Sequence, residues 1–399
     1  MKPILSRRLA TSITIALCFL FAALPARTAR RPRYGGILRV ETGVAVSSLD
    51  PEVATLTPEQ ESAKDQIDSL IYESRNANGA FDGAPGRGPF KISTWQPGKQ
   101  LMLQANDNSA GGRPFVDAVE ITMGRPFRDR LLDLELSKID LAEIPVQEAR
   151  HAVERGVRIS QSQPDELLAL VFLDDHASGN RSRRREIIGQ AVSVCIDRFS
   201  IVTFLLQKVG EPTAALLPQW SSGTSFLFST SADVPRAKEL WAQITPSPNI
   251  VLGYDSADTL EQSVAERIVV NAKEAGISLT AVANPANKSA KIDARLIRVR
   301  LISPKPAAAL NVLLQTLDSA AGPALAGNLL PESASPEEIY KRERATLETF
   351  RIVPLVWLPQ VYGLSARVRN WTTPATGQSW PLADIWLDTD EKSTDTDKN

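Results

Sequence analysis

The amino-acid sequence predicts an α/β fold, in which strands and helices alternate along the chain. Residues 250–254, 260–275 and 277–282 have the pattern of a strand, a helix and a second strand, which is a β-α-β unit. The segment 167–173 is a nearly continuous apolar run, as expected for a strand buried on both faces. Strands and helices also alternate on either side of these segments, which favours a sheet covered by helices.

Length and composition are those of an ordinary globular protein. The chain has 399 residues, of which 43% are hydrophobic and 23% charged, enough for two or three domains with sizeable cores. Its net charge is −1, so no strong field favours nucleic acid or an anionic membrane surface. Four arginines within 181–185 have no aromatic neighbours and are typical of the solvated start of a helix. We therefore expect no nucleic-acid partner. We also expect the chain to be a monomer.

Residues 1–26 have the pattern of a secretory signal peptide. A basic start is followed by the apolar run 10–24 and by small residues up to Ala26. The apolar run has about 15 residues, fewer than the roughly 20 that a membrane-spanning helix needs. We expect export to the periplasm, with anchoring to the inner membrane by an uncleaved signal as the alternative. Loss of the signal would remove Cys18 and leave Cys195 as a small buried hydrophobe without a disulfide partner.

The first half of the chain is expected to form strands joined by short links. A β-hairpin is predicted over 88–106, because Pro97 and Gly98 suit the second and third positions of a tight turn. A helix is predicted to start at Thr57, which can cap it, with Pro58 in its first turn. The other expected elements are strands at 36–41, 116–123 and 139–145 and a helix at 147–155.

The second half adds more helices. A long helical region over 183–208 is predicted to break near Asp197. Ser335 and Glu338 form a capping box that starts a helix running to Phe350. Further elements are a helix at 231–243 and strands at 296–302 and 352–358. The tail 388–399 is polar and acidic and is predicted to be disordered.

The sequence offers little catalytic chemistry. It contains two histidines, His151 and His176, and none of the usual hydrolase, metalloprotease or phosphate-loop motifs. His176 lies beside Asp174 and Asp175, but without a second histidine nearby this is more typical of a solvated loop than of a metal or acid–base site. We therefore expect no enzyme, no bound metal and no cofactor, with a secreted hydrolase as the remaining alternative from this inventory.

A series of short segments, in order from residue 34 to about 371, resembles one protein family. They include YGGILRV and SLDP within 34–51, GPFKI and WQPGK within 88–99, GGRPF at 111–115, KIDLA at 138–142, CIDR at 195–198 and PRAKEL at 235–240. The series is similar to that of the dipeptide- and oligopeptide-binding proteins of bacterial ABC importers, the extracellular solute-binding proteins of family 5. The order of the segments carries the resemblance.

The resemblance implies a two-lobed periplasmic-binding-protein fold of the α/β class, with hinge strands between the lobes. Lobe 1 would comprise 34–174 and 350–385, and lobe 2 would comprise 175–349. The implied function is a non-catalytic, periplasmic substrate-binding protein. It would bind a peptide or other small organic solute between the lobes and deliver it to the permease subunits of an ABC importer. The alternative is a degenerate member that acts as an interaction or scaffold protein in the periplasm.

The chain departs from the family pattern in ways that bear on the ligand. Only 52–87 separate SLDP from the hairpin, where the family has a much longer segment, so its extra small domain is largely missing. A second shortening lies between residues 317 and 336. The segment 298–307 lacks the acidic residue that peptide-binding members carry for the peptide amine. Arg298 or Arg300 would instead favour an anionic group, unless they are exposed strand charges.

The implied cleft has six candidate ligand-binding residues. They are Ser47, Ser48, Asp174, Trp220, Tyr254 and Arg298. Trp220 and Tyr254, like Trp357 and Tyr362, follow or end predicted strands, where an aromatic side chain either lines a cleft or joins the core.

Overall fold

The structure is a computed structural model that describes residues 31–49, 58–71, 73–75, 81–85, 88–173, 180–222, 229–283, 292–321, 327 and 329–388. The chain from Tyr34 onward forms one compact unit, with which the following description is concerned. The predicted signal peptide, Thr57, Asp174, His176 and the tail beyond Asp388 lie outside the described residues.

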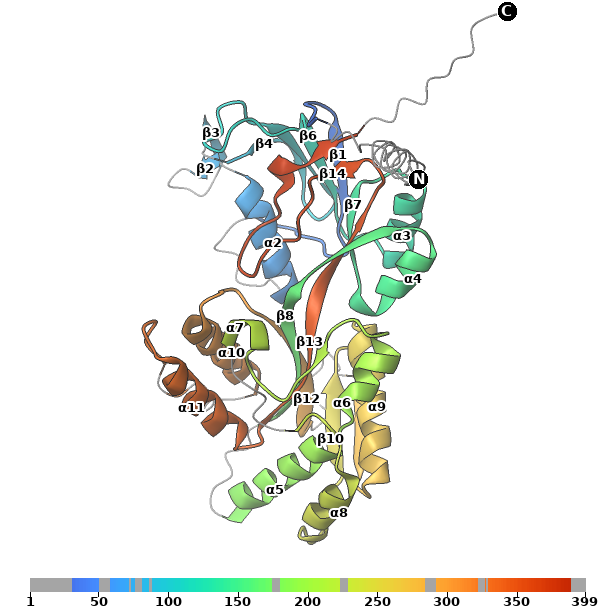
Figure 1. The fold of residues 1–399 in the computed structure, drawn as a ribbon, viewed down its shortest axis with the longest axis vertical. Coiled ribbons are helices and arrows are strands. Elements are labelled where there is room, and N and C mark those ends of the chain that lie inside the picture. The colour runs from blue at the N-terminus through green and yellow to red at the C-terminus, as the bar shows by residue number, and fades with distance from the viewer. Residues whose placement is uncertain are drawn as a thin grey trace, which may run out of the picture. The chain divides into compact units, whose positions relative to one another are not determined.

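One large sheet organises this unit (Figure 1). Within the described ranges it has eleven strands, in the order β11-β10-β12-β8-β13-β7-β1-β6-β5-β4, with β9 paired to β13. The strands are β1 (Ile37–Glu41), β4 (Phe90–Gln96), β5 (Gln100–Ala105), β6 (Ala118–Thr122), β7 (Leu141–Ile144), β8 (Arg158–Phe172), β9 (Glu211–Pro212), β10 (Ile250–Tyr254), β11 (Leu279–Ala283), β12 (Ala294–Arg300) and β13 (Ile352–Leu364). Two separate pairs are β2 (Glu73–Arg75) with β3 (Phe81–Pro85), and β14 (Val368–Arg369) with β15 (Trp386–Leu387).

Helices pack around the sheet, which confirms the α/β class. They are α2 (Pro58–Leu70), α3 (Phe127–Glu135), α4 (Ala149–Glu154), α5 (Asn180–Cys195), α6 (Arg198–Ser200), α7 (Gln219–Ser222), α8 (Val234–Ala242), α9 (Thr259–Glu274), α10 (Pro306–Ala321) and α11 (Pro336–Leu347). We use "lobe 1" for β1, β4–β7 and α2–α4, and "lobe 2" for β10–β12, α5 and α8–α11. Strands β8 and β13 belong to both.

The shared strands β8 and β13 are much longer than the sequence predicts. They pair antiparallel along their length and run through both lobes (Figure 1). The apolar runs 167–173 and 352–358 mark only their lobe 2 halves, because the other halves contain polar residues and prolines, which argue against a strand interior. Two of these prolines, Pro164 and Pro359, pair with each other at a break in the register. The predicted domain boundaries at 174 and 350 stay predictions.

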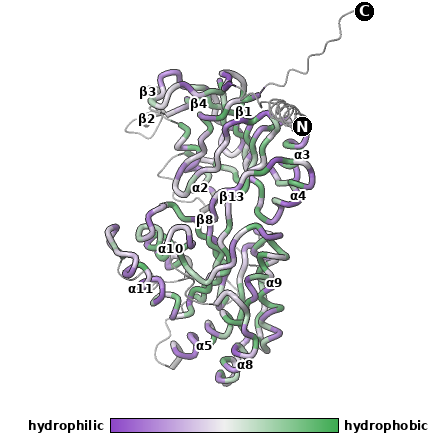
Figure 2. The backbone as a smooth tube through the Cα atoms, in the orientation of Figure 1, coloured by the Kyte–Doolittle hydropathy of each residue, from purple (hydrophilic) through white to green (hydrophobic). Residues whose placement is uncertain are grey.

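Lobe 2 confirms that 167–173 is buried on both faces. Leu168 and Leu170 pack in one cluster with residues of α5, α8 and α9. Leu167 and Ala169 point the other way, into a second cluster with residues of α10 and α11. Helix α9 carries hydrophobic and hydrophilic residues in turn, as Figure 2 shows, and its apolar stripe joins the first cluster.

Lobe 1 contains the predicted hairpin. Strands β4 and β5 are joined by a turn in which Gly98 has φ of +70° and Lys99 N donates to Gln96 O at 3.0 Å. The same turn holds the loop that follows β1, because Gly98 N donates to Val46 O at 2.8 Å. The hairpin therefore positions a loop that, as described below, lines a cavity.

Several local predictions are confirmed and others missed elements. The helical region breaks at Asp197, whose side chain accepts from Ser200 N at 3.1 Å and caps α6. The capping box of Ser335 and Glu338 starts α11. The sequence missed α3, α10 and the β2–β3 pair. Helix α10 is apolar nearly all round, so its period is weak, and β2–β3 lies in a glycine-containing stretch that resembles a link.

The end of the described chain is anchored. Asp388, which the sequence assigns to the disordered tail, is only 2% exposed and pairs with Arg369 at 3.0 Å. The composition of the tail hid this contact, because it depends on a residue of another strand.

Among the described residues, no single helix is long and apolar enough to cross a membrane, although the bent pair Ser182–Cys195 and Arg198–Leu205 passes that test when taken together.

Candidate functional site

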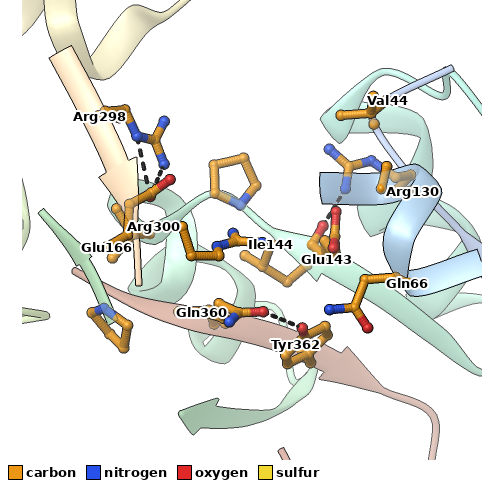
Figure 3. Close-up of a pocket in the computed structure, with 16 residues that line it drawn as sticks. Val44, Gln66, Arg130, Glu143, Ile144, Glu166, Arg298, Arg300, Gln360 and Tyr362 are labelled. Atoms are coloured by element: carbon orange, nitrogen blue, oxygen red, sulfur yellow. Dashed lines mark hydrogen bonds and ion pairs between the residues drawn. The ribbon is translucent and has the colours of Figure 1, made fainter. Parts of the chain in front are cut away.

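A cavity of about 320 Å³ lies where both lobes meet the shared strands (Figure 3). Lobe 1 contributes the loop after β1, helices α2 and α3 and the end of β7, and lobe 2 contributes β12. The parallel strands β1 and β7 have their carboxyl ends at this cavity, the position at which α/β sheets commonly bind ligands. The lining includes Gly43, Val44, Gln66, Arg130, Glu143, Ile144, Glu166, Arg298, Arg300, Gln360 and Tyr362.

On the lobe 2 side, a guanidinium is held between two carboxylates. Arg298 on β12 donates from Nε to Glu166 Oε2 at 3.1 Å and from Nη1 to Asp258 Oδ2 at 2.7 Å, and Nη2 also bonds Glu166. Asp258 is at the same time the N-cap of α9, where it accepts two main-chain N–H groups. Burial alone would raise the pKa of Glu166, but Arg298 and Arg300 outweigh it and lower that pKa. Arg298, Glu166 and Asp258 therefore form an ion-paired network on this wall.

A series of hydrogen-bonded side chains extends across the shared strands. Trp380 Nε1 donates to Tyr362 Oη at 3.2 Å, and Tyr362 Oη donates to Gln360 Oε1 at 2.6 Å. Gln360 Nε2 donates to Asp165 Oδ2 at 2.6 Å. Burial of Asp165 raises its pKa to about 6, although Arg300 and Gln360 act against the shift. This series fixes the amide of Gln360, which points its carbonyl at Tyr362 (Figure 3).

On the lobe 1 side, the charged groups are not ion-paired with each other. Arg130 on α3 is 6% exposed and donates to main-chain oxygens, from Nε to Arg125 O at 3.0 Å and from Nη1 to Glu143 O. No described carboxylate lies within 4.0 Å of its guanidinium nitrogens. Burial lowers the pKa of Arg130, while the charges of Glu143 and Glu41 oppose that change. The half-buried Glu143 side chain projects into the same space (Figure 3).

The six predicted ligand residues have different fates. Arg298 lines the cavity, but two carboxylates hold its guanidinium. Ser47 and Ser48 lie in the loop after β1, three and four residues beyond the lining residue Val44. Trp220 and Tyr254 do not line it: Trp220 donates from Nε1 to Pro164 O at 2.8 Å, and Tyr254 packs against the core of lobe 2. Asp174 lies outside the described residues.

Sequence reasoning missed Glu143, Arg130 and Gln360. A signal for Glu143 was present, because it lies near the end of the predicted strand 139–145, just before Pro145, and carboxyl ends of parallel strands are where ligands bind. His151 is exposed and contacts Glu148 at 3.3 Å. Within the described part of the chain, no group of three His, Cys, Asp or Glu side chains is placed to hold a metal ion.

The two lobes, their shared strands and the cavity between them define a two-lobed α/β fold of the periplasmic-binding-protein type. Residues 44–319 match the profile of the bacterial extracellular solute-binding proteins, family 5. The chain therefore belongs to this family, as the sequence resemblance predicted.

Individual relatives are distant and longer. The oligopeptide-binding protein AppA of Bacillus subtilis is 27% identical over 152 residues, which is 38% of this chain and 26% of AppA. The nickel-binding protein NikA of Staphylococcus aureus is 20% identical over 253 residues, 60% of this chain and 50% of NikA. The chain thus spans half or less of the length of these curated relatives.

A solved structure supports the fold. The periplasmic binding protein DppA of Helicobacter pylori, in complex with the peptide STSA, matches with a TM-score of 0.68 at 13% identity. The match covers 89% of this chain and 99% of that one. At this identity the likeness concerns the fold alone, and it confirms the two-lobed α/β prediction.

Proposed function

We propose that this protein is the substrate-binding protein of an ABC importer, binding a peptide or other small organic solute between its lobes. The observation that carries the proposal is the polar cavity at the carboxyl ends of β1 and β7, lined from both lobes. Family membership gives the class, and the convergence of charged and amide side chains on one cavity supports ligand binding rather than a purely structural role. No catalytic step is proposed.

The cavity size favours a small ligand. A volume of about 320 Å³ is near the lower end of ligand pockets. This suits a solute of amino-acid to dipeptide size better than a long peptide. The largely missing small domain, inferred from the short segment 52–87, agrees with a reduced site.

Lobe closure would be the event that the importer reads. Strands β8 and β13 connect the lobes, and their paired prolines, Pro164 and Pro359, interrupt the ladder, so we propose that the strands bend there. Ligand contacts from both lobes would favour the closed form. We propose export to the periplasm through the signal peptide 1–26, a monomeric state, and the permease subunits as partners.

A thermal-shift screen of the protein without residues 1–26 tests this function. Peptides, sugars, amines and nickel with histidine would each be added at millimolar concentration. A ligand at about a hundred times its Kd stabilises by roughly 2.7 kcal/mol, which corresponds to a shift of roughly 5 °C. No shift with any class of solute would contradict the proposal and favour the interaction or scaffold protein instead.

A further inference from the structure

The carboxylate of Glu143 differs from the other lining carboxylate, Glu166, and from the nearby Asp258 and Asp165. Glu166 and Asp258 are both ion-paired with Arg298, and Asp165 accepts from Gln360. Across the described residues, the Glu143 side-chain oxygens have no hydrogen-bond donor and no cation within 4.0 Å. The bond from Arg130 goes to the main-chain oxygen of Glu143 and leaves its carboxylate unpaired.

The strand that carries Glu143 is paired on both edges, so the point from which its side chain projects is fixed. Glu143 lies on β7, in register with Tyr362 on β13, and its carbonyl accepts from Arg130. Strand β7 is also paired with β1 on its other edge. A side chain presented from a central strand of a sheet is placed more precisely than one presented from a loop.

The negative charge of Glu143 affects the pKa values of other groups that line the cavity. It raises the pKa of Tyr362, behind burial, and it opposes the burial-driven lowering of the pKa of Arg130. It also acts on Arg300 from lobe 2. A half-buried carboxylate without a direct donor has lost part of its hydration and gained no hydrogen bond in return, so a cation that reaches it gains a charge-assisted bond.

We infer that Glu143 is the residue that binds the positively charged nitrogen of the ligand, and that the ligand is a peptide-like solute with a free ammonium group. This inference rests on the proposed function and names its ligand class. The neighbouring guanidinium of Arg130 places a positive charge beside the Glu143 carboxylate. The site therefore suits a solute that carries charges of both signs.

A competition between free and blocked amines tests the inference. The protein without residues 1–26 is mixed with equal amounts of a mixture of dipeptides and the same mixture acetylated at its amines. Native mass spectrometry then measures the ratio of free to acetylated peptides retained. Wild type is compared with Glu143→Gln, Glu143→Asp and the control Glu154→Gln, whose side chain is 60% exposed on α4.

We expect wild type and Glu154→Gln to prefer free amines by about tenfold or more, since a charge-assisted hydrogen bond contributes a factor of this order. Glu143→Gln should reduce the ratio to near one, and Glu143→Asp should fall between. Retention with an unchanged ratio in a folded Glu143→Gln would overturn the inference while leaving the binding function intact. Retention of no peptide by any variant would overturn the peptide-like ligand itself, and with it the role of Glu143.

Discussion

The two walls of the cavity use the same kinds of side chain in opposite ways. On the lobe 2 wall, Arg298 is bound by Glu166 and Asp258 and joins β12, β8 and the start of α9. On the lobe 1 wall, Arg130 bonds only main-chain oxygens and the Glu143 carboxylate has no partner within hydrogen-bonding distance among the described residues. One wall therefore holds its charges in ion pairs within the fold, whereas we propose that the other keeps its charges available to a ligand.

The largest effect should come from breaking the paired wall. Arg298→Ala leaves Glu166 and Asp258 without their guanidinium. We expect a loss of about 2–4 kcal/mol in the free energy of unfolding, below the value for a fully buried pair because the Arg298 side chain is 32% exposed. Urea denaturation measures it. Arg236→Ala, which removes an exposed pair with Glu239, should change stability by less than about 1 kcal/mol. Equal losses in both variants would refute the distinction.

The pH dependence of stability should reveal Asp165, a buried carboxylate near that wall whose ionised form is unfavourable. Burial raises the pKa of Asp165 to about 6 in the folded state, above its value of 3.8 in model compounds. Its protonated form therefore stabilises the fold fully below about pH 4, and this contribution is lost as the pH rises through about 6.

Asp165→Asn removes this titration and keeps an oxygen for Gln360. Relative to wild type, the variant should gain up to about 3 kcal/mol between about pH 4 and pH 7, at about 1.4 kcal/mol per unit of pKa shift. Urea unfolding at several pH values measures the difference. A difference between the two proteins that stays constant with pH would show that Asp165 ionises normally.

A smaller effect is expected from the series of hydrogen-bonded side chains on the shared strands. Tyr362→Phe removes the hydroxyl that accepts from Trp380 and donates to Gln360. Leaving a buried N–H without its acceptor costs about 1–2 kcal/mol. Without the hydrogen bond from Tyr362, the Gln360 amide is less firmly oriented, and we expect the affinity for the ligand to fall severalfold. Denaturation and isothermal titration calorimetry check the two effects. Wild-type values for both would show that the hydrogen bonds of Tyr362 contribute neither to stability nor to ligand binding.

The smallest effect concerns a residue that the sequence favoured. The Ser47 side chain is exposed and does not line the cavity. Ser47→Ala should change the affinity for any ligand found in the screen by less than about twofold, the usual range for surface substitutions. A tenfold loss in calorimetric titration would show that the loop after β1 contacts the ligand beyond Val44.

The parts of the fold that follow from local chemistry were predictable. The turn at Gly98, the caps at Asp197 and Ser335 and the stripe of α9 each depend on residues close in sequence. The lobe 1 halves of β8 and β13 were not, because polar residues and Pro164 become strand only by pairing with a distant strand.

The site was less predictable for the same reason. Arg298 was predicted as a ligand residue and lines the cavity, but its guanidinium is bound by Glu166, which lies 132 residues away in the sequence. Glu143 is distinguished by having no cation close to its carboxylate among the described residues. A sequence pattern cannot show that a side chain lacks a neighbour. What the sequence supplied was the strand end at 139–145, and the topology then placed that end at the cavity.

The central claim is that the solute binds in the cavity between the lobes. Gly43→Phe tests it most directly, because a Cβ at Gly43 would lie 2.9 Å from Arg130 Nη2 and the larger ring would fill the space beside it. The measurement is the ligand-induced shift in Tm of wild type and of the variant, with cooperative unfolding as the check on folding. We predict a shift of roughly 5 °C in wild type and less than about 1 °C in Gly43→Phe. Equal shifts in the two proteins would contradict the account and place the ligand elsewhere.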